Sequence, residues 1–139
     1  TFDVVYSVGL IEHFDDPRPL VRRHVELLKP GGTALILIPN YRGLYGRLQQ
    51  YFDPENLTIH NLDIMTCNAL EALAPIDLLS EVETKRVGRL DPALLSPHKR
   101  WPASIARAIH FAFNALGVVQ PFDIPSLCPW IALQAVRAR

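Results

Sequence analysis

The chain has 139 residues, which is long enough to bury a hydrophobic core. Of these residues 49% are hydrophobic, a composition that excludes an intrinsically disordered protein. Its 14 basic and 14 acidic residues give zero formal net charge, so no overall field favours nucleic acid or an anionic membrane. Cys67 and Cys128 have no neighbouring cysteine or histidine cluster, which is typical of buried apolar thiols in a reducing compartment. We expect one cytoplasmic domain that does not bind nucleic acid.

The first 40 residues predict a strand, a helix and a second strand. Residues 4–8 form a short β-branched apolar run, the pattern of a parallel strand covered on both faces. Asp15, Asp16 and Pro17 then begin a helix that ends at residues 29–32, where Lys-Pro-Gly-Gly favours a turn. Its apolar stripe is Leu20, Val21, His24, Leu27 and Leu28. Residues 33–38 are the purest buried-strand pattern of the chain, so we predict a right-handed βαβ unit and an α/β fold.

Beyond Asn40 the patterns are weaker. Residues 41–52 are aromatic and arginine-rich and predict a mobile loop or an irregular helix, and residues 63–73 predict a helix. Residues 78–87 and 130–136 predict strands, the first partly exposed. Residues 103–116 predict a helix whose core-facing side carries Ile105, Ile109, Ala112 and Leu116. We expect a single domain, residues 1–139, with a βαβ core (1–40), a substrate-side loop and helix (41–77), and terminal strands with an inserted helix (78–139).

Three stretches together resemble a known family: FDVVYSVGLIEHF (residues 2–14), LLKPGG (27–32) and TALILIPN (33–40). They are similar to the central region of class I S-adenosylmethionine-dependent methyltransferases, above all those acting on quinone precursors, lipids and other small molecules. The resemblance implies a Rossmann-like sheet of strand order 3-2-1-4-5-7-6 with an antiparallel seventh strand. This chain would then supply strands in the order 4-5-7-6. The implied activity is methyl transfer from S-adenosylmethionine to a small-molecule acceptor.

The chain departs from the family at the cofactor. The family's glycine-rich loop and the acidic residue that holds the ribose hydroxyls are absent from the sequence. Gly31 and Gly32 precede a strand rather than follow one, so they mark a turn and not a nucleotide-binding loop. We expect the C-terminal part of a longer enzyme, inactive by itself; a truncated gene is the other explanation.

Ser7, Val8 and Gly9 are the cofactor residues that the resemblance implies, because ligands of open α/β sheets bind beyond the carboxyl ends of the strands. Their backbone carbonyls would accept hydrogen bonds from the cofactor's ammonium group. Alternatively, Ser7 caps the strand.

Glu12 and His13 are the candidate catalytic pair. Relatives that methylate phenolic hydroxyls carry Glu-x-x-Glu-His here, a pattern associated with a divalent metal or with proton removal, and this chain has Gly9 in place of the first Glu. Since a hard cation prefers several oxygen ligands, we assign no metal. His13 as general base is chemically sensible, because imidazole titrates near neutral pH. The structural alternative is that either side chain caps the following helix.

Asn40, Tyr41, Arg42 and Tyr45 follow the second predicted strand and are the candidate substrate residues. Aromatic rings beside arginine suit a planar or anionic acceptor, and they equally suit a loop that packs on its own domain.

The helix at residues 103–116 is flanked by Lys99, Arg100, Trp101, Arg107 and His110. We expect it to cover a sheet or to form a dimer contact rather than to touch a membrane. Two further functions stay open: a methyltransferase-like binding domain without catalysis, and a Rossmann-type NAD(P)-dependent oxidoreductase.

Overall fold

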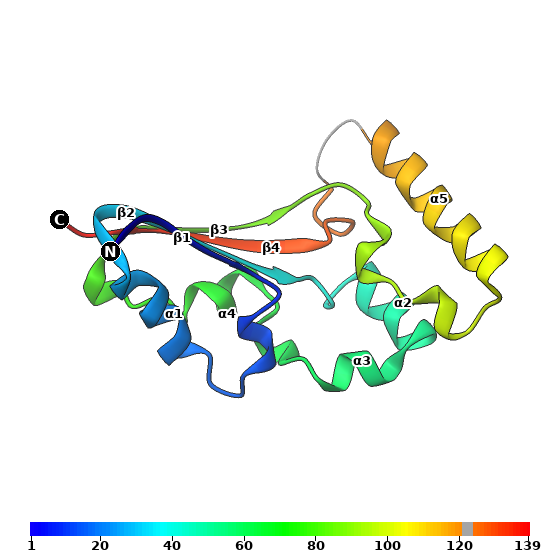
Figure 1. Ribbon diagram of the computed structural model, residues 1–139, viewed down its shortest axis with the longest axis horizontal. Coiled ribbons are helices and arrows are strands. Elements are labelled where there is room, and N and C mark those ends of the chain that lie inside the picture. The colour runs from blue at the N-terminus through cyan, green and yellow to red at the C-terminus, as the bar shows by residue number, and fades with distance from the viewer. Residues whose placement is uncertain (121–123) are drawn as a thin grey trace.

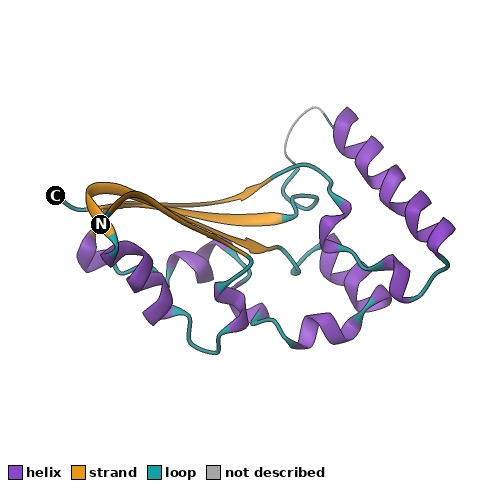
Figure 2. Ribbon diagram, in the orientation of Figure 1, coloured by secondary structure: helices purple, strands orange, loops and turns teal. Residues whose placement is uncertain are grey.

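The structure is a computed structural model that describes residues 1–120 and 124–139. Figures 1 and 2 show a twisted sheet with helices gathered mainly on one side of it. The strands are β1 (Phe2–Val8), β2 (Leu28–Pro39), β3 (Leu79–Val87) and β4 (Trp130–Arg137). The helices are α1 (Arg18–Glu26), α2 (Leu44–Phe52), α3 (Pro54–Thr58), α4 (Cys67–Glu71) and α5 (Ala103–Val119). The α/β class predicted from the sequence is confirmed.

The strand order within the described residues is β1-β2-β4-β3. β1 and β2 are parallel neighbours, with Tyr6 opposite Leu35, and α1 connects them, so the predicted βαβ unit is confirmed. β4 runs antiparallel to both β2 and β3. The strands predicted at residues 78–87 and 130–136 correspond to β3 and β4.

The described helices leave one face of the sheet open. On the covered face, Ala34, Ile36 and Ile38 of β2 are fully buried and belong to the core. On the open face, alternate residues of β1 are exposed by 51% or more: Phe2, Val4, Tyr6 and Val8. The prediction that β1 is covered on both faces is therefore not met by the described residues, because α1 and α4 lie on the same side of the sheet (Figure 1).

The helix predicted to end at residues 29–32 ends earlier. α1 stops at Glu26, and β2 begins at Leu28. The reason is pairing with β1: Phe2 lies opposite Leu28, and the N–H of Phe2 donates to the carbonyl of Leu27 over 2.9 Å. The glycine segment lies inside β2 as a bulge between the pairs Phe2–Leu28 and Val4–Thr33. Gly31 has φ +79°, which a glycine adopts without strain.

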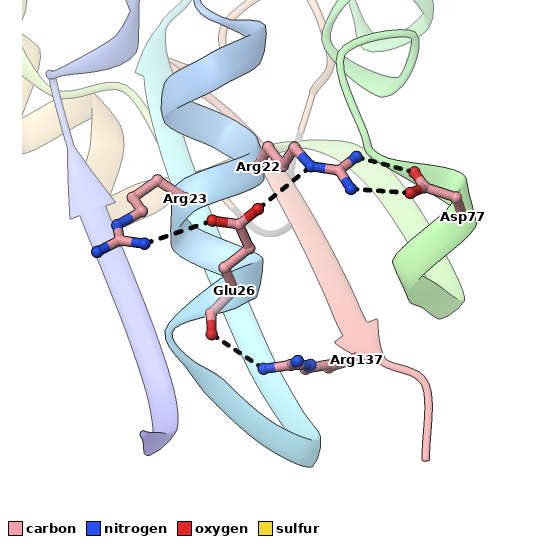
Figure 3. A network of polar contacts seen from close by, with 5 residues as sticks. All are labelled: Arg22, Arg23, Glu26, Asp77 and Arg137. Carbon is pink, nitrogen blue, oxygen red and sulfur yellow. Dashed lines mark hydrogen bonds and ion pairs between the residues drawn. The ribbon is translucent and has the colours of Figure 1, made fainter.

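Polar contacts join α1 to the rest of the fold (Figure 3). The guanidinium of Arg22 donates two hydrogen bonds to Asp77, over 3.2 and 3.0 Å, and one to Glu26 over 3.2 Å. Arg137 at the end of β4 donates to the carbonyl oxygens of Glu26 and Leu28. These groups are largely exposed, so they fix the orientation of α1 more than they stabilise the fold.

Two regions differ from the sequence prediction. Residues 41–52 contain the regular helix α2, and the single helix predicted at residues 63–73 is a 3₁₀ turn, Leu62–Ile64, followed by the short α4. Thr66 separates the two, because its backbone is extended and its hydroxyl oxygen accepts a hydrogen bond from the N–H of Ala69 at the start of α4.

Helix α5 is present, but its buried side is not the predicted one. Ala106 and Gly117 are buried, whereas Ile105 and Leu116 are 42% and 54% exposed. At position 117 the helix packs so closely on Leu90 that a Cβ would be 2.1 Å from the Leu90 carbonyl oxygen, so only glycine fits there. Of the apolar stripe chosen from the sequence, Ile105, Ala112 and Leu116 are therefore exposed in the described structure, and Ile109 is half-buried. None of the described helices is long and apolar enough to cross a membrane.

Candidate active site

The first wall of the site is the segment that leaves the carboxyl end of β1. Gly9 has φ +65°, which turns the chain away from the sheet. The next residues form a 3₁₀ turn, Ile11–His13, in which Ile11 is fully buried and anchors the turn in the core. Glu12 is 1% exposed and His13 is exposed, so the turn presents one buried acid and one accessible imidazole.

The second wall is the segment between α3 and α4, and Asn61 attaches it to the first. The backbone N–H of Asn61 donates to the carbonyl of Glu12 over 2.6 Å. Its side-chain amide donates to the carbonyls of Phe14 and Asp15, over 3.1 and 3.2 Å. One residue thus holds together two segments that are far apart in the sequence.

The two walls enclose a cleft of about 500 Å³, lined by residues 12–15 and 58–63. Two imidazoles meet in it: the rings of His13 and His60 are 4.6 Å apart, centre to centre. Nδ1 of His13 lies 3.0 Å from the carbonyl oxygen of Ile59, and Nδ1 of His60 lies 2.5 Å from that of Asn56. Because a carbonyl only accepts, each Nδ1 carries the proton, and in the neutral ring each Nε2 keeps a free lone pair.

Glu12 brings a carboxyl group into the same cluster. One ligand atom from each of Glu12, His13 and His60 lies within 4.8 Å of the other two. Oε2 of Glu12 is buried and has no hydrogen-bond partner among the described residues. Burial raises the pKa of Glu12 and lowers that of His60, since it disfavours the charged form of each. The cluster therefore combines an uncompensated acid with two bases.

Two of the four candidate substrate residues contact residues that line this cleft but do not line it themselves. The ring of Tyr41 meets His60 edge-on with centroids 5.2 Å apart, and burial raises the pKa of its hydroxyl. Arg42 donates to the carbonyl of Leu62 and to the carboxylate of Asp63, each over 2.9 Å, and so supports the second wall.

The other two lie elsewhere. Asn40 is 3% exposed and its amide donates to the carbonyl of Cys128 over 2.9 Å. Together with Arg42 it lines a separate cleft of about 340 Å³. Tyr45 is fully buried, and its hydroxyl accepts the N–H of Asp91 over 2.8 Å.

The candidate cofactor residues lie on β1, which is the edge strand of the described sheet. Ser7 is 8% exposed, and its hydroxyl has no hydrogen-bond partner among the described residues. Val8 is 51% exposed on the open face, and the N–H of Gly9 donates to the carbonyl of Leu37 over 3.0 Å.

Sequence reasoning put His60 on the face where the substrate would enter, but it did not bring His60 together with Glu12 and His13, and it did not place Asn61 at the site. His13 and its partner Ile59 are 46 residues apart, and neither residue type at 60 or 61 marks a motif. The turn after α3 brings both residues to Glu12, so only the tertiary arrangement shows that they meet it.

Comparison with known proteins gives a family and a fold. The sequence profile of a family described as "Methyltransferase domain" matches residues 1–130. An uncharacterized protein of Mycobacterium tuberculosis strain H37Rv is 48% identical over 40 residues, 29% of this chain and 14% of that protein. A protein of strain CDC 1551 matches in the same way.

Two solved structures have a similar fold. One is phosphoethanolamine N-methyltransferase 2 of Haemonchus contortus in complex with phosphomonomethylethanolamine and S-adenosylhomocysteine, with TM-score 0.56 and 18% identity over 99% of this chain. The other is a complex between the Haloferax volcanii Trm112 methyltransferase activator and a methyltransferase, with TM-score 0.53 and 18% identity over 99% of this chain. The chain spans 34% and 54% of the lengths of these two matched chains.

Proposed function

The chain belongs to the methyltransferase domain family that residues 1–130 match, and from this premise we propose that it takes part in methyl transfer from S-adenosylmethionine to a small-molecule acceptor. One observation carries the proposal: β1 and β2 are parallel neighbours, and Glu12 and His13 follow the carboxyl end of β1 at a cleft. In open α/β sheets this is where ligands bind.

In this proposal β1, β2, β3 and β4 are the family's fourth, fifth, sixth and seventh strands, which the order β1-β2-β4-β3 and the antiparallel β4 support. An NAD(P)-dependent Rossmann domain does not call for that antiparallel strand. Ser7, Val8 and Gly9 would contact S-adenosylmethionine, which supplies an activated methyl group on sulfur. The glycine-rich loop and the ribose acid of the family are not among the 139 residues, so we propose that the chain alone is inactive.

His13 would accept the acceptor's proton. Its Nδ1–H is held by the carbonyl of Ile59, so Nε2 is the basic atom. The acceptor's hydroxyl would give its proton to Nε2 as its oxygen takes the methyl group, whose bond to the sulfur of S-adenosylmethionine would break and leave S-adenosylhomocysteine. The carboxyl of Glu12, when ionised, stabilises the imidazolium that results. The other residues of the cleft would align the acceptor with the methyl group and exclude water.

The lining of the cleft favours a phenolic or otherwise planar acceptor. The rings of His13 and His60 line the cleft, and the buried ring of Tyr41 packs edge-on against His60. The guanidinium of Arg42 is already bonded to Leu62 and Asp63, so in this proposal Arg42 positions the second wall of the cleft. Asn40 and Tyr45 lie away from the cleft and take no part in it.

The test is methyl transfer from labelled S-adenosylmethionine by the natural protein that contains this chain, with phenolic, thiol and amine acceptors offered in parallel. We expect His13→Gln to lower kcat about 10² to 10⁴-fold with a smaller effect on KM, and to remove the acidic limb of the pH–rate curve. His98→Gln, at an exposed histidine far from the cleft in sequence, is the matched control and should leave both constants unchanged. Absence of transfer to every acceptor class, or an unchanged His13→Gln variant, would refute the proposal.

A further inference from the structure

We propose that Glu12, His13 and His60 form a binding site for one divalent cation of the zinc class. The inference goes beyond methyl transfer, and binding of the ion does not depend on the proposed function. Its starting point is the mutual distance: one ligand atom of each residue lies within 4.8 Å of the other two.

The tautomers of both histidines are those of metal-binding imidazoles. A ligating histidine almost always donates its second ring N–H to a carbonyl or a carboxylate, which orients the ring. His13 does so to Ile59 over 3.0 Å and His60 to Asn56 over 2.5 Å. Both Nε2 lone pairs therefore remain for a cation, and no hydrogen bond to either atom is found within the described residues.

The carboxyl group supplies an independent observation. Glu12 is 1% exposed, and its Oε2 is buried without a hydrogen-bond partner among the residues that the structure describes. A buried carboxylate is costly unless it is paired or coordinates a metal, and a cation between Glu12 and the two imidazoles would compensate it. Neither arginine of the surrounding segments reaches it: Arg18 pairs with Asp16 and Arg42 with Asp63.

The geometry requires only a small contraction. Two ligands about 2.1 Å from a tetrahedral zinc ion stand about 3.4 Å apart, so the widest pair needs to close by about 1.4 Å. His13 is exposed, so its side chain has room to shift toward the other two ligands. The chain would supply three ligands, and the fourth position would face the cleft of about 500 Å³.

The ligand types select the cation. Two imidazole nitrogens and one carboxylate oxygen suit zinc and its first-row neighbours, whereas magnesium prefers an octahedron of oxygens. The site thus differs from a hard-cation site built on carboxylates, and His60 is the residue that makes it possible. A lone pair that binds the cation cannot also accept a proton, so in the zinc-loaded protein Nε2 of His13 would be a ligand and not the base. An acceptor hydroxyl on the cation would then lose its proton to solvent more readily.

The binding test uses the 139-residue chain stripped with a chelator and titrated with zinc chloride in a calorimeter, without cofactor or acceptor. We expect one ion per chain, and an affinity at least tenfold lower in each of His13→Gln, His60→Gln and Glu12→Gln. His98→Gln, at an exposed histidine outside the cleft, controls for surface binding and should bind as the wild type does. No binding, or binding that survives both cleft histidine variants, would overturn the proposal, as would a magnesium affinity equal to that for zinc.

A second measurement needs no substitution and so avoids variants that fail to fold. In ¹⁵N-labelled wild type, zinc should shift the side-chain Nε2 resonances of His13 and His60 and leave those of His24 and His98 in place. Shifts confined to other histidines would contradict the site. Because binding is read without catalysis, loss of the methyl-transfer proposal leaves this result intact, and an active enzyme that binds no zinc refutes this inference alone.

Discussion

Replacement of Ile36 by alanine tests which face of the sheet holds the core. Ile36 is fully buried at the centre of β2, between Ser7 of β1 and Leu133 of β4. The substitution removes three carbons, worth about 2.4 kcal/mol in transfer free energy. A residual cavity of about 40 Å³ adds about 1 kcal/mol. We expect the free energy of unfolding to fall by about 3.5 kcal/mol, or the Tm by about 12 °C.

Leu37→Ala is the matched control, because it removes the same number of carbons from the adjacent residue on the open face. Leu37 is only partly buried, so we expect a loss of about 1 to 1.5 kcal/mol. Urea denaturation of the chain and its two variants, followed by circular dichroism, measures both values. A loss at Leu37 equal to or larger than that at Ile36 would refute the assignment of faces, since a register slip of one residue exchanges them.

Three further predictions concern the site. Burial raises the pKa of Glu12 above its ordinary value of 4.5, so the folded chain binds this proton more tightly than the unfolded chain. The protonated carboxyl therefore contributes fully to the free energy of unfolding below pH 4.5, and this contribution is lost as the pH rises through the pKa of the folded state. The glutamine of Glu12→Gln cannot ionise. In the presence of a chelator, the free energy of unfolding of this variant relative to wild type should therefore increase from pH 4 to pH 8, and a constant difference would contradict the burial argument. Asn61→Ala removes the side-chain hydrogen bonds to Phe14 and Asp15 and should cost about 1 to 3 kcal/mol with faster amide exchange at residues 12–15; unchanged exchange would show that the two walls are held by other contacts. Calorimetry should detect weak or no binding of S-adenosylmethionine to the 139-residue chain, and micromolar affinity would show that the glycine-rich loop is dispensable.

The sequence by itself determined the βαβ unit and the later strands. The alternation and purity of the apolar runs at residues 4–8 and 33–38, with a helix stripe between them, allow few other arrangements. The end of α1 was predicted too late, because pairing of Phe2 with Leu28 ended the helix, and local turn signals do not contain that long-range contact.

The inner side of α5 shows the same limit. Ile105 and Leu116 lie on an apolar stripe, yet the small residues Ala106 and Gly117 face the neighbouring segment. Hydrophobicity favours the stripe, whereas the close approach of Leu90 admits only a residue without a Cβ at position 117. Close packing of backbones depends on tertiary distances that a periodicity does not encode.

The candidate site divides in the same way. Glu12 and His13 could be singled out from the sequence, because they follow a buried strand at the end where ligands bind. The contact of His60 with Glu12 and His13 came only from the fold, which places residues 58–63 against residues 12–15. Local patterns specify elements through nearest-neighbour preferences, whereas a cluster of side chains from distant segments depends on how those elements pack.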